Sequence, residues 1–259
     1  MKLSIVIPSY NNEKWLDKCF SSILEQTFTD YEVIVIDDMS TDDSMKIIKK
    51  YKNIFKTKGI KYTYEQCKSK RLSGGTRNEG ILKASGDYIL CIDCDDWLVD
   101  KEVLQDIANT LNGEDIMFLD YISHKKDYDL LMQNRNNTKE EALHNITCAI
   151  WTKVVKRDLM LQCLFPEGTL FEDRIQHYEV VLKAKTMKNF NKPAIVWNRL
   201  NENSTSGNNN YLWNTYRFSY IGELYRLYNK LEPGEFKDYI KNEINHYMNL
   251  IKEMVDEYK

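Results

Sequence analysis

An apolar strand that ends in clustered carboxylates constrains this chain more than any other feature of its sequence. The strand is expected over Tyr88–Ile92, and Asp93, Asp95 and Asp96 follow it directly. Carboxylates this close repel one another, and a cation between them offsets the repulsion. The stretch therefore predicts a site for a hard divalent metal and for the phosphates that such a metal binds.

The first hundred residues alternate between strand and helix patterns. Leu3–Ile7 and Val33–Ile36 are continuous apolar runs rich in β-branched residues, which is typical of strands buried on both faces. Ile60–Tyr64 is a weaker strand, and amphipathic helices are expected between the strands. Because right-handed crossovers place such strands side by side, we predict an α/β fold with a mainly parallel, Rossmann-like sheet flanked by helices.

The rest of the chain is patterned less regularly. A strand is expected over Ile116–Tyr121, a long irregular loop over residues 123–145, and a helix that opens at Glu172-Asp173. From residue 211 the spacing is helical, with a break at Pro233-Gly234. A C-terminal helical extension is therefore expected to follow the sheet.

Three segments that are far apart in the sequence follow expected parallel strands at their carboxyl ends. They are Pro8–Tyr10, Asp37-Asp38 and Asp93–Asp95. Open α/β sheets bind their ligands at this edge. The convergence predicts one ligand-binding site there. Its carboxylates offer the oxygen ligands that Mn²⁺ and Mg²⁺ take, together with substrate phosphates, so either ion is the expected cofactor.

Composition and charge argue against several classes of protein. The chain has 259 residues, of which 42% are hydrophobic, and a formal net charge of −3, which does not suit a strongly basic nucleic-acid binder. No apolar run of about 18 residues is present, and the N-terminal apolar run is too short for a signal-peptide core, so we expect a cytoplasmic protein without a transmembrane segment. The apolar stripe of the last helix is expected to pack on the domain, with peripheral membrane contact as the alternative.

The six cysteines are scattered along the chain, and we expect reduced, mostly buried thiols. Cys91 and Cys94 have the C-x-x-C spacing of redox and zinc sites. On a strand, however, these two side chains point to opposite faces, and no second pair of ligands completes a zinc site.

Four motifs resemble, in order and spacing, the family 2 inverting glycosyltransferases, which have the GT-A fold. Two lie in SIVIPSYNNEKWLDKCFSSILEQTFTDYEVIVIDDMSTDDS, and TRNEGILKASGDYILCIDCDDWL and FEDR follow. The resemblance is good over residues 1–100, patchy over 100–210 and absent beyond. It implies a GT-A catalytic domain over residues 1–210, with a nucleotide-binding half at 1–100 and an acceptor-side half at 101–210, before the helical extension at 211–259.

The resemblance implies roles for residues on the donor side. Pro8 and Tyr10 would line the pocket for the nucleotide base, and Asp38 would accept a hydrogen bond from a uracil ring. Arg77 and Asn78 would lie beside the donor. The donor would be a nucleotide-diphosphate sugar, most simply a UDP-sugar.

The resemblance also implies the chemistry of transfer. Asp93 would lie near the ribose, Asp95 would bind the metal with its diphosphate, and Asp173 would be the general base. Such a base takes the proton of an acceptor hydroxyl while that hydroxyl attacks the anomeric carbon from the opposite face, which inverts the configuration in one displacement. The chain departs from the usual pattern at Cys94 and Met39, and neither departure removes an oxygen ligand.

Three residues are candidates for the acceptor side. Trp151 and Lys153 either form part of an acceptor wall or pack in the core, and Glu172 stands beside the expected base. Glu172-Asp173 also suits a helix N-terminus, where acidic side chains are favourable. Arg199 and the loop Ser204–Ser206 are candidates for a lid over the donor.

The acceptor remains open between two alternatives at this point. A hydroxyl of a glycan or lipid-linked saccharide is the first, and a hydroxylated base in DNA, as in phage genome modification, is the second. A non-catalytic module that binds sugar nucleotides is the alternative from another class. A dinucleotide-dependent oxidoreductase is disfavoured, because no G-x-G-x-x-G follows the first strand.

Overall fold

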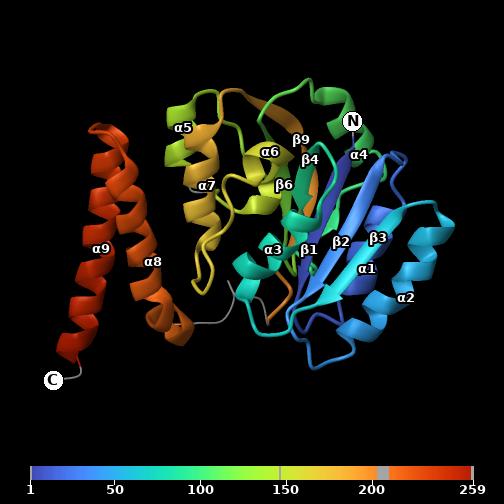
Figure 1. Ribbon diagram of the computed structural model, residues 1–259, viewed down its shortest axis with the longest axis horizontal. Coiled ribbons are helices and arrows are strands. Elements are labelled where there is room, and N and C mark those ends of the chain that lie inside the picture. The colour runs from blue at the N-terminus through green and yellow to red at the C-terminus, as the bar shows by residue number, and fades with distance from the viewer. Residues whose placement is uncertain (1, 146, 203–209, 258–259) are drawn as a thin grey trace.

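Four parallel strands form the half of the sheet that the alternating pattern predicts (Figure 1). They are β1 (Leu3–Ser9), β2 (Tyr31–Asp37), β3 (Lys61–Gln66) and β4 (Tyr88–Cys91), in the order β3-β2-β1-β4. Every residue of β1, β2 and β4 is buried, as continuous apolar runs require. The computed structural model describes residues 2–145, 147–202 and 210–257.

Helices cover both faces of this sheet and give each face its own core. α1 (Leu16–Leu24) and α2 (Ser44–Thr57) bury Phe20 and Phe55 on one face. α3 (Leu72–Lys83) buries Ile81 on the other face. The polar connections between strands and helices are therefore left at the two ends of the sheet.

The second half of the sheet is mixed. β8 (Lys153–Lys156) is antiparallel to both β4 and β6 (Ile116–His124), and β9 (Met187–Asn198) is parallel to β6. β5 (Trp97–Leu98) pairs antiparallel with β9, and β7 (Asp129–Met132) forms a hairpin with β6. Within the described residues all nine strands belong to this one sheet. The expected parallel, Rossmann-like arrangement thus holds for the first four strands, and antiparallel neighbours, which need no crossover helix, complete the sheet.

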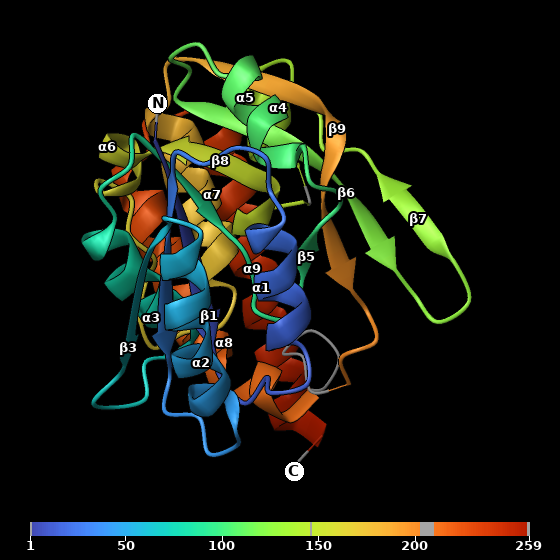
Figure 2. The same ribbon diagram turned by 90° about the vertical axis from the view of Figure 1, so that its right-hand side faces the viewer.

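Residues 123–145 are more ordered than the expected long loop, so that prediction was wrong. They contain the rest of the β6–β7 hairpin, which projects from the body of the protein (Figure 2), and the helix α5 (Lys139–His144). The side chain of Thr138 caps α5 by accepting the backbone N–H of Glu141 at 3.0 Å. Because β7 is exposed on both faces, no alternation of burial marks it in the sequence.

The remaining helices lie around the second half of the sheet. They are α4 (Val103–Thr110), the 3₁₀ turn η1 (Ile150–Thr152), α6 (Arg157–Met160), α7 (Glu172–Lys183), α8 (Asn210–Lys230) and α9 (Glu235–Glu257). α7 begins at Glu172, and the hairpin of α8 and α9 turns at the expected Pro233-Gly234 break. Leu224 of α8 and Ile240 of α9 join the core beneath α7, so the C-terminal hairpin packs on the face that α3 and α7 cover (Figure 1). No helix in the described part of the chain is both long and apolar enough to cross a bilayer.

Candidate active site

The carboxyl ends of β1, β2 and β4 meet at one edge of the sheet. The backbone N–H of Asp38, after β2, donates to the carbonyl of Ser9 at the end of β1, at 2.7 Å. The N–H of Ile92, after β4, donates to the carbonyl of Val6 at 3.0 Å. These bonds bring together three segments that are far apart in the sequence, in the order that right-handed crossovers dictate.

Asp38 anchors the start of α3. Its two carboxylate oxygens accept the backbone N–H groups of Arg71 at 2.7 Å and Leu72 at 3.0 Å. Leu72 has a φ of +59°, in the left-handed region, so the turn into α3 depends on this bracing. The side chain of Lys70 donates to the Asp38 carbonyl at 3.0 Å. An interaction of Asp38 with a nucleotide base stays a prediction.

Tyr10 and Pro8 differ in their exposure. Pro8 is buried within β1, opposite Ile36 of β2. Tyr10 follows the strand end and is 46% exposed, with the ammonium of Lys70 over its ring. An exposed ring at the edge of the sheet is available for stacking, and its place in a base pocket remains a prediction.

Arg77 joins the carboxylates after β4 to those at the start of α7. Its Nη1 donates to Glu172 at 2.8 Å and to Asp173 at 3.0 Å, and its Nη2 donates to Asp93 at 2.7 Å. The side chain is only 4% exposed. A buried guanidinium that contacts three carboxylates fixes their relative positions, because its donors lie in one rigid plane.

Two neighbours of Arg77 on α3 allow this approach. A side chain at Gly74 would place its Cβ 2.8 Å from the Pro166 carbonyl oxygen and 3.0 Å from a carbon of Glu172. Asn78 exchanges two hydrogen bonds with the backbone of Phe165, at 2.9 and 3.0 Å. Asn78 is buried and holds the segment that leads into α7, and its predicted place beside a donor is not tested by these contacts.

Glu172 and Asp173 occupy the first turn of α7, after Phe171 in the left-handed conformation. Burial, and then the charge of Asp173, raise the pKa of Glu172 to about 7. Burial also raises the pKa of Asp173, against the lowering effect of Arg77. The side chain of Asp173 is 22% exposed and that of Glu172 only 10%. A carboxylate with a raised pKa and access to solvent is suited to accept a proton.

Asp95 and Asp93 face the same edge, whereas Asp96 points inward. Burial, and then the charge of Asp93, raise the pKa of Asp95 to about 6. Asp96 is 1% exposed, and its carboxylate accepts the backbone N–H of Asn198 at 2.8 Å. Two partly exposed carboxylates, two positions apart, that offer only oxygen are a donor set that Mn²⁺ or Mg²⁺ fits.

Asn201 is a contact of Asp95 that the sequence did not reveal. Its side-chain amide donates to Asp95 at 2.7 Å and to the side chain of Asn12 at 3.1 Å. The only signal in the sequence was the Ser/Asn/Gly loop to which Asn201 belongs. The expected lid residues Ser204–Ser206 lie outside the described residues, and the guanidinium of Arg199 lies over the ring of Trp197 at 4.3 Å.

Trp151 and Lys153 are both buried. Trp151 packs edge-on against Tyr121, with ring centres 4.9 Å apart. The ammonium of Lys153 donates to the carbonyls of Cys148 at 2.8 Å and Ala149 at 2.7 Å, and burial lowers its pKa to about 8. These contacts tie β8 to the segment before η1, and contact with an acceptor stays a prediction for both residues.

The cysteines carry no disulfide. All six, each in the described part of the chain, are free thiols, and four of them are buried. Cys91 lies in the core on one face of the sheet and Cys94 in the core on the other. The C-x-x-C spacing therefore does not bring these two thiols together.

Comparisons with known proteins place this fold and site in a family. Residues 4–165 match the family model described as glycosyl transferase family 2. Because the match covers more than half of the 259 residues, the chain belongs to this family, and its mixed sheet flanked by helices is the GT-A fold.

Solved structures agree in fold. A crystal structure of Staphylococcus aureus TarS, residues 1–349, in complex with UDP-GlcNAc superposes with a TM-score of 0.73 at 23% identity, covering 95% of this chain and 72% of that one. The mannosyltransferase PcManGT from Pyrobaculum calidifontis, in complex with GDP-Man and Mn²⁺, superposes with a TM-score of 0.63 at 14% identity, covering 94% and 69%.

Three relatives illustrate the range of similarity in sequence. The poly(ribitol-phosphate) β-N-acetylglucosaminyltransferase TarS of Staphylococcus aureus is 36% identical over 42% of this chain and 18% of its own length. The glycosyltransferase GlyA of Streptococcus pneumoniae is 29% identical over 79% of this chain and 31% of its own length. The chain thus spans less than a third of these two relatives. The putative teichuronic acid biosynthesis glycosyltransferase TuaG of Bacillus subtilis is 26% identical over 93% of this chain and 96% of its own length.

Proposed function

We propose that the chain is a metal-dependent, inverting glycosyltransferase that moves a sugar from a UDP-sugar to a hydroxyl of a glycan or lipid-linked saccharide. The observation that carries the proposal is the contact of one buried guanidinium, Arg77, with Asp93 on the donor side and with Asp173 on the other. The carboxylate that would lie beside the donor and the carboxylate that would remove the proton thus contact one and the same side chain.

Asp95 would hold Mn²⁺ or Mg²⁺ in this proposal, and Asp93 would lie near the ribose of the donor. When bound, such an ion neutralises charge on the departing diphosphate. Asn201 fixes one oxygen of the Asp95 carboxylate through its amide. Tyr10, at the exposed end of β1, would stack on the base, and Asp38 would contact it from the neighbouring strand end.

Asp173 would accept the proton of the acceptor hydroxyl. It is the more exposed of the two acidic residues at the start of α7, and it accepts the backbone N–H of Ile150. Arg77 holds it in place from the side of α3. Glu172 is nearly buried beside it and would act by orienting Arg77. Because proton removal and attack by the hydroxyl occur in one displacement, no residue of the enzyme need act as nucleophile.

The acceptor class is supported by the relatives. TarS and TuaG carry names that refer to poly(ribitol-phosphate) and teichuronic acid, and none of the relatives described above is named for DNA. A hydroxylated DNA base therefore has no support as the acceptor. We further propose that residues 1–210 form the catalytic domain and 211–259 an extension.

Thermal unfolding with nucleotide diphosphates tests the donor side. UDP with Mn²⁺ should raise the melting temperature of the chain, by about 5–10 °C at one hundred times the dissociation constant. Asp95→Ala should remove the shift, because it removes the carboxylate that binds the metal. An unchanged shift in excess chelator would contradict metal dependence, and a larger shift with GDP than with UDP would contradict the choice of donor.

Asp173→Asn tests the general base separately. This variant keeps the size of the side chain and should bind UDP with Mn²⁺ normally. Transfer or donor hydrolysis should fall by roughly 10²–10⁴-fold. Glu172→Gln is the matched variant, one residue away. If Asp173→Asn turns over at a normal rate while Glu172→Gln does not, the base is Glu172.

A further inference from the structure

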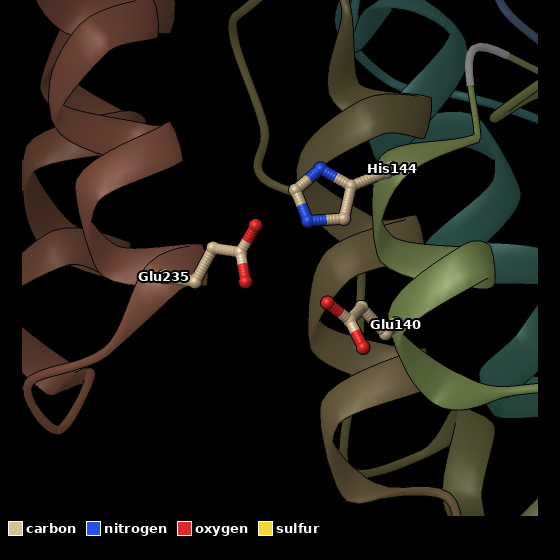
Figure 3. A group of neighbouring side chains, drawn as sticks. All are labelled: Glu140, His144 and Glu235. Carbon is tan, nitrogen blue, oxygen red and sulfur yellow. The ribbon is translucent and has the colours of Figure 1, made fainter.

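A second group of metal-ligating side chains lies away from the proposed active site, where α5 faces the start of α9. The group consists of Glu140 and His144 of α5 and Glu235 of α9 (Figure 3). One ligand atom from each residue lies within 4.8 Å of the other two. Between the helices, Leu143 and Phe236 line a shallow cavity of about 290 Å³ beside this group.

The secondary structure presents these three side chains together. Glu140 and His144 are four residues apart on α5, so they share one face of the helix. The ring of His144 is held edge-on against Tyr239 of α9, with ring centres 4.8 Å apart, and against Phe236 at 6.1 Å. His144 is therefore positioned by the same helix that supplies Glu235.

Within residues 2–145, 147–202 and 210–257, no lysine or arginine side chain pairs with the Glu140 or Glu235 carboxylate. Among the described residues, no hydrogen bond reaches the side chain of Glu140 or Glu235. The two neighbouring lysines are directed elsewhere: Lys139 donates to the carbonyl of Leu182 at 2.9 Å, and Lys237 donates to the carbonyl of Leu231 at 2.6 Å. Two carboxylates and an imidazole thus face one another, and the part of the chain that the structure describes places no balancing positive charge on them.

We propose that Glu140, His144 and Glu235 bind a divalent transition metal, with Zn²⁺ as the best fit, and that this metal clamps α9 onto α5. An imidazole nitrogen with two carboxylates suits zinc better than Mg²⁺ or Ca²⁺, which take oxygen ligands. Tetrahedral zinc with ligands at about 2.0–2.2 Å holds its ligand atoms roughly 3.4 Å apart. The exposed glutamates reach this geometry by changing rotamer, and water supplies the fourth ligand.

The clamp would add to the contacts between α9 and the body of the protein, where Arg174 and Tyr178 of α7 already donate to Glu243 of α9 at 3.0 and 3.1 Å. α9 packs mainly on α8, and α8 packs on α7, whereas α5 and α9 approach each other chiefly through the aromatic contacts of His144. A metal that takes ligands from both α5 and α9 adds a direct link between the sheet-bearing body and the last helix. The site is separate from Asp93 and Asp95, so its loss should not remove donor binding.

Zinc titration into the full chain carrying Asp95→Asn tests the proposal, because this background weakens the other metal site. One equivalent of Zn²⁺ should bind, and it should raise the melting temperature. Co²⁺ in place of zinc should give the visible absorption of a tetrahedral site. His144→Ala and Glu235→Gln should each weaken zinc binding about tenfold or more, which corresponds to about 1.4 kcal/mol.

Two variants serve as matched controls. His246→Ala removes an exposed histidine of α9, and Glu232→Gln removes an exposed carboxylate of the same hairpin, both outside the group. Zinc affinity should be unchanged in each. Absence of zinc binding by the parent chain, or binding of equal strength in Glu235→Gln, overturns the site. Binding without a rise in melting temperature overturns the clamp.

Discussion

Removing the charge of Arg77 should be among the most damaging single substitutions in this protein. Arg77 is 4% exposed and donates to Glu172, Asp173 and Asp93 at 2.7–3.0 Å. Replacement by methionine keeps an unbranched side chain of similar length but leaves three carboxylates facing one another. Removing one partner of a buried ion pair costs roughly 3–5 kcal/mol, which is a large part of the roughly 5–15 kcal/mol that stabilises a typical domain.

The cost should depend on pH in a defined direction. Without Arg77, the pKa values of Glu172 and Asp173 rise further, because Arg77 lowers both in the wild type. A carboxyl whose pKa is higher in the folded state binds more protons there than in the unfolded state, so its presence destabilises the fold at high pH and less so at low pH. The deficit of Arg77→Met relative to wild type should therefore shrink as the pH falls from 7 to 5. Lys153 also lowers the pKa of Asp173, but it is present in the wild type and in Arg77→Met alike, so it does not reverse the expected pH dependence.

Urea denaturation at pH 7 and pH 5 measures the effect. Arg77→Lys is the control, because lysine keeps the positive charge but lacks the planar guanidinium that donates to several carboxylates at once. Its free energy of unfolding should fall by roughly 1–3 kcal/mol, with a weaker dependence on pH. A loss below about 1 kcal/mol for Arg77→Met, against the range expected for a buried pair, would refute the reasoning. So would a deficit that is equal at the two pH values.

Two further substitutions test the packing and the charge beneath the site. Gly74→Ala should lower the free energy of unfolding by roughly 1–3 kcal/mol in urea denaturation and reduce transfer, because its Cβ would lie 2.8 Å from the Pro166 carbonyl oxygen. Gly222→Ala on α8 is the control: its Cβ would meet open space, and it should raise the free energy of unfolding by roughly 0.5–1 kcal/mol. If Gly74→Ala left the free energy of unfolding unchanged, α3 would be able to move away from Pro166 without cost, and the reasoning would be wrong. Burial lowers the pKa of Lys153 from 10.5 to about 8, so between these pH values the unfolded chain binds more protons than the folded chain. The free energy of unfolding of the wild type, relative to that of Lys153→Met, should therefore rise by up to about 3 kcal/mol from pH 8 to pH 10.5. A difference that does not change with pH would refute a lowered pKa.

The parallel half of the fold was predictable because its signals are local. Leu3–Ile7 and Val33–Ile36 are apolar at every position, and a strand buried on both faces requires this. The shared edge then follows from crossover handedness alone. The exposed strand β7 and the short helix α5 were missed, since neither has a buried face long enough to impose a period on the sequence.

The contacts within the candidate site were predictable only in part. Their residue types stood out, but Arg77 and Asp173 are 96 positions apart, and no local spacing announces their hydrogen bond. Asn201 was overlooked for the same reason, because its partner Asp95 lies 106 positions earlier. Conversely, a contact with the nucleotide base was predicted for Asp38 and stays a prediction, whereas the structure shows that Asp38 braces the turn into α3, a task that no motif specifies.

The charges at this edge explain why a donor with a diphosphate should require a cation. The guanidinium of Arg77 contacts three carboxylates, and Asp95 lies near enough for the charge of Arg77 to lower its pKa, so acidic groups outnumber this one basic group. A diphosphate brings further negative charge to the same place, and repulsion between like charges is strong where water is excluded. We therefore expect UDP to bind weakly in chelator, and added salt to improve that weak binding by screening the repulsion. With Mn²⁺ present, added salt should instead weaken UDP binding, because attraction then dominates. Isothermal titration of UDP at two salt concentrations, once in chelator and once with Mn²⁺, measures how salt changes the affinity in each case. A salt effect of the same direction in chelator and in Mn²⁺ would contradict this account.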